Sequence, residues 1–343
     1  MGRFELLQEL CAAHGVSGRE DAVREILLRE IRPLADSVEI TPLGNLIAFK
    51  KGGKRPKTRL MLDAHMDEVG LIITGVTEEG FLSFSTVGGI DRRVLPGKTV
   101  WIEGKLPGVI GVKPIHLLKE EEKLQSVPPE DLYLDIGACS REEAEEQVRL
   151  GDAAVFDSVF DLSHGMVKSR ALDDRSGCAL LVELMKDGLK YDTTFVFSVQ
   201  EEVGSGGAGT AAFEVKPQAA IAVGCTAAAD IAGVKRGREV CRLGDGPAVS
   251  FLDRQTVYDR EYYHLTFEAA KSAGVKCQPK RAVAGGNGAG AIQLSRSGVR
   301  VAAVSLPCRY LHSPVGIIAQ KDYKAAKKLL AVLAERIAET DTV

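Results

Sequence analysis

The sequence contains 343 residues, of which 45% are hydrophobic and 27% are charged. These proportions are typical of a globular protein with one large domain or two unequal ones. The 44 basic and 47 acidic residues give a net charge of −3 and include no long basic block, which argues against nucleic acid or a membrane surface as a partner and favours a small molecule or a protein.

The cysteines and the first residues of the chain predict a cytoplasmic protein. The seven cysteines are odd in number, scattered, and never arranged as a C-x-x-C pair, which is typical of buried thiols in a reducing compartment. The stretch "MGRFELLQELCAAHG" has the pattern of an amphipathic helix with acidic residues. Because no long apolar run follows it, neither a secretory signal nor a membrane span is expected.

Two helices are expected at the start of the chain. The second lies in "SGREDAVREILLREI", where Ser17 and Glu20 have the spacing of a capping box before an apolar helical stripe. A hairpin is then predicted at "TPLGNLIAFKKG", followed by the short apolar strand "RLMLDAH". This strand ends in polar residues, so its end is a candidate position for chemistry.

The pattern changes between residues 68 and 160. Short alternating strands are separated by glycine turns, as in "GLIITGVTEEGFLSFSTVGGID", and only "SREEAEEQV" has a helical pattern. This texture predicts a small β-rich, barrel-like domain inserted at residues 68–160.

Long helices and apolar strands alternate in the remainder of the chain. The runs "TTFVFSV" and "AAIAVGCT" are predicted strands, and "DYKAAKKLLAVLAERIAET" is a predicted helix. This alternation is typical of a mainly parallel sheet covered by helices on both faces. The sequence therefore predicts an α/β fold for residues 1–67 and 161–343, interrupted by the inserted domain.

Imidazoles and carboxylates follow several of the predicted strands, at the sheet edge where α/β proteins bind ligands. Each motif has a simple alternative: a histidine in the core, an Asp-Asp helix cap, a solvated pair of glutamates, or a turn before proline. Together they favour a metal site, because these ligands suit zinc, cobalt or manganese, and two metals that share a carboxylate can activate water. The candidate residues are His65, Asp67, Glu68, Asp173, Asp174, Glu201, Glu202 and His312.

The motifs "DAHMDEVG", "ALDDRSGC", "VQEEVG" and "PCRYLHSP", in this order, resemble those of the glutamyl aminopeptidase or tetrahedral aminopeptidase group, metallopeptidase family forty-two. The resemblance extends from the first helix to the last. Some members of this group are named endoglucanases, and others form tetrahedral dodecamers. The resemblance implies a metal-dependent aminopeptidase that acts on short peptides.

The resemblance also implies a role for each metal ligand. His65 would bind the first metal, and Asp67 would orient its ring. Asp173 would bridge two metals, and Glu202 and His312 would complete the second site. The cofactor expected is a divalent metal, zinc or cobalt or else manganese, with one or two ions per chain.

Further implications concern the catalytic base and the assembly. Glu201 would act as general base, taking a proton from the attacking water and giving it to the leaving amine. Family members often have a cis peptide bond between Asp173 and Asp174. The inserted domain at residues 68–160 would mediate formation of a homo-oligomer.

The sequence departs from the family pattern at three acidic positions. Gly224 stands where the family has the remaining ligand of the first metal, and Gly288 and Gly316 also stand where acidic residues are usual. The first site therefore keeps only His65 and the bridging Asp173 and should bind metal weakly. The thiol of Cys225 could replace the lost ligand only through a bulge, because successive strand residues point to opposite faces.

Two functions of different classes follow. The first is a cytoplasmic metallo-aminopeptidase with one or two metals and reduced activity, supported by the retained base Glu201. The second is a catalytically impaired family member that serves as a binding or assembly subunit, supported by Gly224. A glycosidase is disfavoured, because adjacent glutamates do not flank a glycosidic bond at the separation that this chemistry requires.

Overall fold

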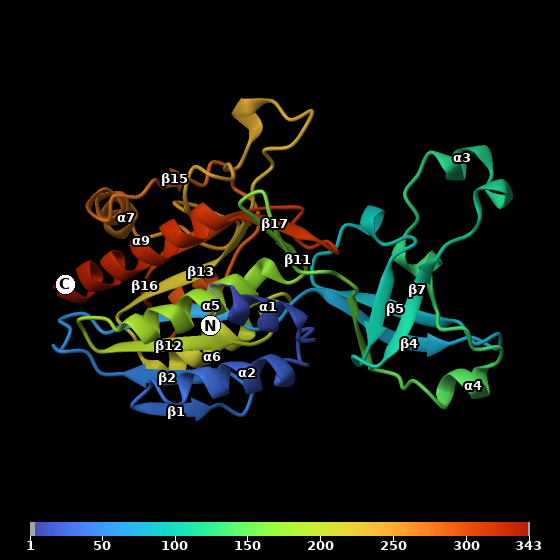
Figure 1. Cartoon of the computed structure of the whole chain (residues 1–343), viewed down its shortest axis with the longest axis horizontal. Coiled ribbons are helices and arrows are strands. Elements are labelled where there is room, and N and C mark those ends of the chain that lie inside the picture. The colour runs from blue at the N-terminus through green and yellow to red at the C-terminus, as the bar shows by residue number, and fades with distance from the viewer. Residues whose placement is uncertain (1–3, 342–343) are drawn as a thin grey trace.

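A mixed β-sheet forms the centre of the larger part of the protein in the computed structural model, which describes residues 4–341 (Figure 1). Its main path has the order β1-β2-β12-β3-β13-β16-β17-β11-β10, and the short strands β14 and β15 pair beside β16. The strands are β1 Ser37–Ile40, β2 Leu46–Lys50, β3 Leu60–His65, β10 Asp161–Ser163, β11 Met166–Ser169, β12 Thr193–Ser198, β13 Ala219–Ala227, β14 Ala248–Val249, β15 Gln278–Pro279, β16 Arg300–Arg309 and β17 Gly316–Ala319.

The four central strands are parallel, and antiparallel strands extend the sheet on both sides. β3 is buried along its whole length, as are nearly all residues of β12 and β16. Strands that are covered on both faces have continuous runs of apolar residues in the sequence. For this reason these strands could be predicted from the sequence. The predicted α/β architecture is confirmed.

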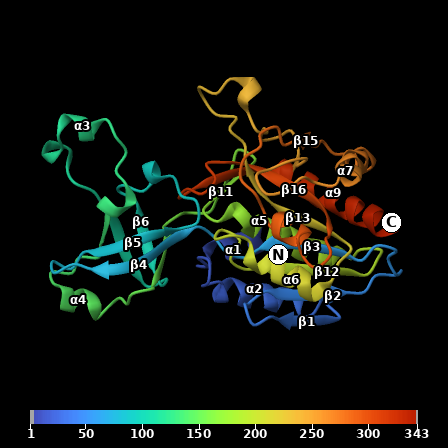
Figure 2. The same cartoon turned by 180° about the vertical axis from the view of Figure 1, so that it is seen from behind.

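Helices cover both faces of this sheet (Figures 1 and 2). On one face α5 packs against β3 and β13, and α9 packs against β16 and β3. On the other face α6 packs against β12 and β3, and α8 packs against β16 and β13. None of the helices within residues 4–341 is both long and apolar enough to cross a membrane. The helices of this part are α1 Glu5–Ala12, α2 Asp21–Ile31, α5 Leu172–Asp187, α6 Gly206–Val215, α7 Arg260–Ser272, α8 Ala289–Gln293 and α9 Gln320–Glu339.

The alternation of side chains along β3 decides which residues face each layer. Leu60, Leu62 and Ala64 belong to the core beneath α5 and α9, whereas Met61 belongs to the core beneath α6 and α8. Because side chains alternate along a strand, the odd-numbered polar residues at the end of β3 lie on the α6 and α8 face.

A closed barrel lies beside the α/β part, at the right of Figure 1. It has its own hydrophobic core and two short helices, α3 Glu120–Lys123 and α4 Arg141–Glu145. Its position in the chain, between β3 and β10, agrees with an insertion; the exact limits of 68 and 160 and its role in assembly stay predictions. Its strands are β4 Gly70–Val76, β5 Leu82–Val87, β6 Thr99–Ile102, β7 Leu106–Gly111, β8 Tyr133–Asp135 and β9 Ala153–Phe156.

The predicted capping box of the second helix is wrong. α2 begins at Asp21, and its N-cap residue Glu20 makes no side-chain capping bond. The hydroxyl of Ser17 instead donates to Oδ2 of Asp67 at 2.6 Å. Glu20 Oε1 accepts from the backbone N–H of Gln200 at 3.1 Å. Both side chains support the turns that carry candidate site residues, and a contact of this range is invisible in local spacing.

Candidate active site

Side chains from separate segments meet at the carboxyl ends of the parallel strands, the usual position of ligand sites in α/β sheets. β3 ends at a histidine, the turn after β12 carries two glutamates, an aspartate opens α5, and the turn after β16 carries a second histidine. The structure thus brings together the four residues predicted as metal ligands: His65, Asp173, Glu202 and His312.

Asp173 lies between the two imidazoles. Its Oδ1 is 3.4 Å from Nε2 of His65, and its Oδ2 is 3.4 Å from Nε2 of His312. The same nitrogen of His312 is 3.2 Å from Oε1 of Glu202. Two atoms that each bind a tetrahedral zinc ion at about 2.0–2.2 Å lie about 3.3–3.6 Å apart. The spacing and the donor types therefore fit a metal ion.

The start of α5 separates the roles of two neighbouring aspartates. The peptide bond between Asp173 and Asp174 is cis, as the resemblance implies. Asp174 accepts a hydrogen bond from the backbone N–H of Gly177 at 2.9 Å, which is what a helix cap does. Its Oδ2 is buried without a hydrogen-bond partner among the described residues. The simple capping alternative thus holds for Asp174, whereas Asp173 faces the imidazoles.

Attraction between imidazoles and carboxylates dominates the electrostatics of the site. Burial opposes the charged form of His312, but Asp173 and Glu202 raise its pKa to about 11. Burial also opposes charge on His65, whereas Asp173 and Asp67 raise its pKa well above the usual value. These carboxylates therefore favour positive charge at the site. In addition, Oε1 of Glu202 is buried and has no well-aligned hydrogen bond among residues 4–341. Such surroundings suit a divalent cation.

Asp67 connects the histidine motif to the two glutamates. Its carboxylate accepts hydrogen bonds from the backbone N–H groups of Glu201 at 3.0 Å and of Glu202 at 3.1 Å, in addition to the Ser17 hydroxyl. Its Oδ1 lies 3.3 Å from Nδ1 of His65. A carboxylate in this position fixes the imidazole ring and the glutamate turn relative to each other.

Glu201 lies at the edge of the cluster, with Oε2 4.0 Å from Nε2 of His65. The hydroxyl of Ser205 donates to its Oε1 at 3.2 Å. Burial raises the pKa of Glu201 to about 7, with Glu202 and Asp173 adding to the rise and His65 opposing it. A carboxylate with a pKa near neutrality can both accept and return a proton.

Gly224 leaves a gap beside this cluster. Ala222 lies on the same face of β13 and pairs with Asp63 of β3. Gly224 therefore lies next to the end of β3. A Cβ at Gly224 would lie 3.8 Å from Oδ2 of Asp174, an ordinary contact, so the space could accept a side chain.

The thiol of Cys225 lies on the other face of β13, 3.3 Å from the carbonyl oxygen of Leu172. It comes within 4.8 Å of carboxylate oxygens of Asp173 and Asp174 from that side. The bulge that would turn the thiol toward His65 is absent, because β13 pairs with β16 without a register shift.

Two glycines of the barrel reach the site and were not singled out from the sequence. Nδ1 of His312 lies 3.1 Å from the carbonyl oxygen of Gly89, a contact that directs Nε2 toward the carboxylates when Nδ1 carries the proton. Gly88 has φ +81°, and a Cβ there would lie 3.2 Å from Cβ of Glu202. The double glycine in "STVGGID" was the only available signal.

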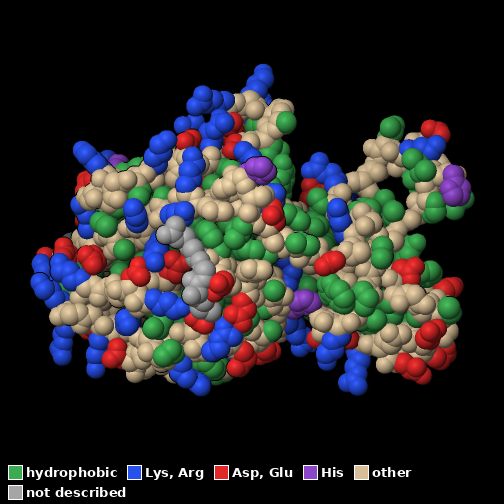
Figure 3. Space-filling view, in the orientation of Figure 1, with side chains coloured by type: hydrophobic (Ala, Val, Ile, Leu, Met, Phe, Trp, Pro, Cys, Tyr) green, Lys and Arg blue, Asp and Glu red, His purple; other side chains and the backbone are tan. Residues whose placement is uncertain are grey.

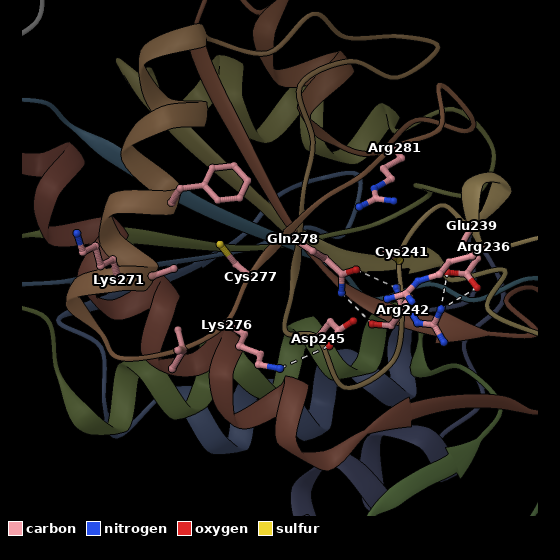
Figure 4. Close-up of a pocket in the computed structure, with 13 residues that line it drawn as sticks. Arg236, Glu239, Cys241, Arg242, Asp245, Lys271, Lys276, Cys277, Gln278 and Arg281 are labelled. Carbon is pink, nitrogen blue, oxygen red and sulfur yellow. Dashed lines mark hydrogen bonds and ion pairs between the residues drawn. The ribbon is translucent and has the colours of Figure 1, made fainter.

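The cluster opens into a cavity of about 320 Å³, which also contains Asp63 and Lys280. The segments 239–242 and 278–281 contribute to its wall and also to a second cavity of about 570 Å³. Figure 4 shows that second cavity, in which Arg242 pairs with Glu239. It contains none of the predicted site residues.

Comparison with solved structures identifies the class of protein. A TET aminopeptidase from a marine sediment archaeon of the Thaumarchaeota is 34% identical, with a TM-score of 0.93 and coverage of 97% of this chain and 96% of that one. The TET1 peptidase of Pyrococcus horikoshii is 38% identical, with a TM-score of 0.85 and coverage of 96% and 98%. The fold is that of the aminopeptidases.

Sequence comparison identifies the family. Residues 44–329 match the model of the M42 glutamyl aminopeptidase family, and the chain belongs to this family. The lysyl aminopeptidase of Pyrococcus furiosus is 32% identical over 98% of each chain. The resemblance read from the motifs is confirmed, and the chain is a hydrolase of the aminopeptidase class whose family implies a divalent metal.

Proposed function

We propose that this chain removes N-terminal residues from short peptides, using a divalent metal held at the strand ends. The observation that carries the proposal is the position of Asp173, which faces His65 and His312 at 3.4 Å each, beside the two glutamates. This arrangement matches the reaction class of the family, hydrolysis of a peptide bond by activated water.

Four residues would hold the metal: His65, Asp173, Glu202 and His312. Asp173, Glu202 and His312 provide three ligands and leave a position open, the usual arrangement of a catalytic zinc site. When bound, the metal would polarise the peptide carbonyl and lower the pKa of water. Zinc and cobalt suit these donors best, and manganese is a third choice.

The protein's own residues would carry the proton. Glu201 takes a proton from the attacking water and gives it to the leaving amine. The Ser205 hydroxyl and the bonds from Asp67 to the glutamate turn hold Glu201 in place for both transfers. Asp67 also fixes the ring of His65.

A second candidate function, a catalytically impaired assembly subunit, is favoured by Gly224. The first metal position keeps His65 and Asp173, but β13 adds no carboxylate there, and its thiol at Cys225 lies on the other face. If hydrolysis requires two metals, this gap would remove several kcal/mol of transition-state stabilisation, or roughly 10²–10⁴ in rate.

We further propose that the chain forms a homo-oligomer through the barrel and resides in the cytoplasm. The solved TET1 peptidase of Pyrococcus horikoshii assembles into a tetrahedron or a large octahedral shell. All seven cysteines are free thiols, which supports a reducing compartment.

The discriminating experiment measures metal per chain in protein purified without chelator, together with hydrolysis of aminoacyl anilides with and without added cobalt. The enzyme hypothesis predicts at least one metal per chain and measurable turnover. Glu201→Gln should retain the metal and lose about 10²–10⁴-fold in kcat. Absence of both metal and turnover would rule out the enzyme hypothesis and leave the impaired subunit as the remaining alternative.

A further inference from the structure

Asp63 is a buried carboxylate in the candidate active-site cavity that the reaction itself does not use. Only 2% of the surface of Asp63 is exposed to solvent. It lies on β3 two residues before His65, on the same face of the sheet. Its Oδ1 has no hydrogen-bond partner within the described part of the chain, and no ion pair formed by those residues includes it. The side chain of Ser198 is a hydrogen-bonding neighbour of Asp63, but no ion pair offsets the negative charge, and a buried carboxylate without such a pair is unfavourable.

Small residues keep this carboxylate open to the cavity. A Cβ at Gly288 would lie only 2.6 Å from Oδ2 of Asp63, closer than any real contact. Ala222 is the residue paired with Asp63 on the adjacent strand β13, and it also lines the cavity. Any larger side chain at position 288 would occupy the space in front of the carboxylate.

No lysine or arginine among residues 4–341 forms an ion pair with Asp63, and the positive charge that acts on it belongs to His65, a residue expected to bind the metal. Lys280 lines the same cavity, but its charge interacts with Asp253 and Asp173. The charges that act on Asp63 are instead those of His65 and Asp67. Two groups within residues 4–341 could hold a metal ion, and Asp63 belongs to neither. The compensating cation would therefore come with a ligand.

We propose that Asp63 binds the cationic side chain of the substrate's N-terminal residue, which makes peptides that begin with lysine or a similar basic residue the preferred substrates. This inference rests on the proposed aminopeptidase function. Two residues along a strand span about 6.6 Å, a distance that the four-carbon stem of lysine can bridge. The α-amino group, in contrast, must stay beside the carbonyl that is attacked, at the level of His65 and Asp173.

A binding experiment tests this without requiring turnover. L-Lysine and L-norleucine have the same α-amino group and side chains of similar length, but only lysine has the terminal ammonium. Calorimetry on the metal-loaded protein should show lysine binding at least about 10-fold more tightly, since a hydrogen bond to a charged group typically contributes a factor of this size. Equal affinity would overturn the proposal and show that Asp63 does not recognise the side chain.

Two variants locate the effect at Asp63. Asp63→Asn, of nearly the same shape, should reduce the lysine preference about 10- to 100-fold. The double variant Asp63→Ala/Gly288→Asp places a carboxylate in the same space from the residue before α8, and should recover part of the preference. Each variant is checked for its melting temperature, so that a folding defect is separated from lost recognition. A lysine preference that survives Asp63→Asn in a folded protein would contradict the proposal.

Turnover separates this inference from the proposed function. The ratio of kcat/KM for lysyl and norleucyl anilides should fall in Asp63→Asn by the same factor as the affinity ratio. If the wild-type protein hydrolyses norleucyl and lysyl anilides equally well, the aminopeptidase function stands and the role of Asp63 is wrong. If lysine binds selectively but no anilide is hydrolysed, the recognition site stands and the peptidase function fails.

Discussion

The backbone of Gly224 runs beside His65 and Asp174, and its missing side chain leaves one wall of the candidate metal site without a ligand. Asp173 can serve both sides of the site, because one oxygen faces each histidine. His65, Asp173 and Glu202 offer ligand atoms within 4.8 Å of one another, and His312 lies beside Glu202, but β13 adds no carboxylate on the side of His65. We therefore expect the number of metals per chain to depend on position 224 of β13.

Gly224→Asp should restore the first metal position, the one that His65 serves. The added Cβ meets only an ordinary contact at 3.8 Å, and the glycine does not need a left-handed backbone. Without metal, the new carboxylate lies against Asp174 and should lower the melting temperature through like-charge repulsion. With zinc, elemental analysis should show about one more ion per chain, and the melting temperature should rise above that of the wild-type protein.

Gly237→Asp provides the matched control. It adds the same carboxylate at an exposed glycine with nothing within 4 Å of the new Cβ and no left-handed backbone, so it should change neither the metal content nor the response of the melting temperature to zinc. If Gly224→Asp leaves the metal content unchanged, the absence of an aspartate at position 224 is not the cause of weak metal binding at the first site.

The principal residues of the site could be read from the sequence because each lies at the end of a recognisable strand or helix. His65, Asp173, Glu202 and His312 stand in short motifs, and the apolar runs before them fix the sheet edge at which they meet. Ser17 was missed, because a serine four residues before a helix is read as a cap, whereas its partner lies 50 residues away.

At the scale of secondary-structure elements, a buried ionic network joins α1, α5 and the start of the barrel. Glu68 accepts hydrogen bonds from Arg170 and from Nη2 of Arg175, the latter at 3.1 Å. Nη1 of Arg175 also donates to the carbonyl oxygen of Leu10 at 2.5 Å and to that of Ala13 at 3.0 Å. The arginines thereby satisfy the last carbonyls of α1, which a helix end leaves without partners.

Glu68→Gln should destabilise the fold by about 3–5 kcal/mol, because it leaves two buried guanidinium groups without a negative partner. Urea unfolding followed by circular dichroism measures the change. Glu9→Gln, which breaks the exposed pair of Glu9 with Arg29, should cost less than about 1 kcal/mol. Similar losses in the two variants would show that the network is not a principal stabilising feature.

Sequence patterns predicted the elements better than their ends. The parallel strands and the long helices were found because their apolar periodicity spans many residues. The start of α2 was misplaced, since Ser17 and Glu20 have capping chemistry but use it across the fold. The first turn of α5 contains a cis peptide bond that local propensity does not encode, and this bond was expected only from the family resemblance.

At the scale of the whole molecule, the barrel contributes directly to the candidate site through the turn after β5. The carbonyl oxygen of Gly89 meets His312, and Gly88 lies against Glu202. A side chain at Gly88 would be strained at φ +81° and would press on Val69 at 2.7 Å and on Glu202 at 3.2 Å. The inserted domain is thus part of the site's wall as well as a candidate assembly surface.

Gly88→Ala should weaken metal binding by displacing Glu202, and a zinc titration with a competing chelator should show a lower affinity. Gly137→Ala is the matched control, because Gly137 is another barrel glycine with φ +83° but has nothing within 4 Å of the added Cβ. Both variants bear similar backbone strain. A loss of zinc affinity in Gly137→Ala of equal size would mean that strain in the barrel, and not contact with Glu202, is responsible.

The barrel also carries the surface expected to bind a second copy of the chain. Its long loop around α3 projects from the molecule and displays hydrophobic side chains (Figures 1 and 3). Ile115, Leu117 and Leu124 are exposed there, and Leu124 is 91% exposed. Apolar side chains gathered on one projecting loop are typical of an interaction surface.

The double variant Ile115→Asp/Leu124→Asp should therefore dissociate the homo-oligomer, since burying two new carboxylates in an interface is strongly unfavourable. Light scattering after size exclusion measures the mass of each species. Leu294→Asp places the same charge on an exposed leucine at the end of α8, in the α/β part, and should leave the assembly intact. Dissociation by Leu294→Asp alone would move the interface to the α/β part, and a monomeric wild-type protein would remove the assembly proposal altogether. Because Gly88 and Gly89 belong to the same barrel, loss of zinc affinity on dissociation would further show that assembly stabilises the site.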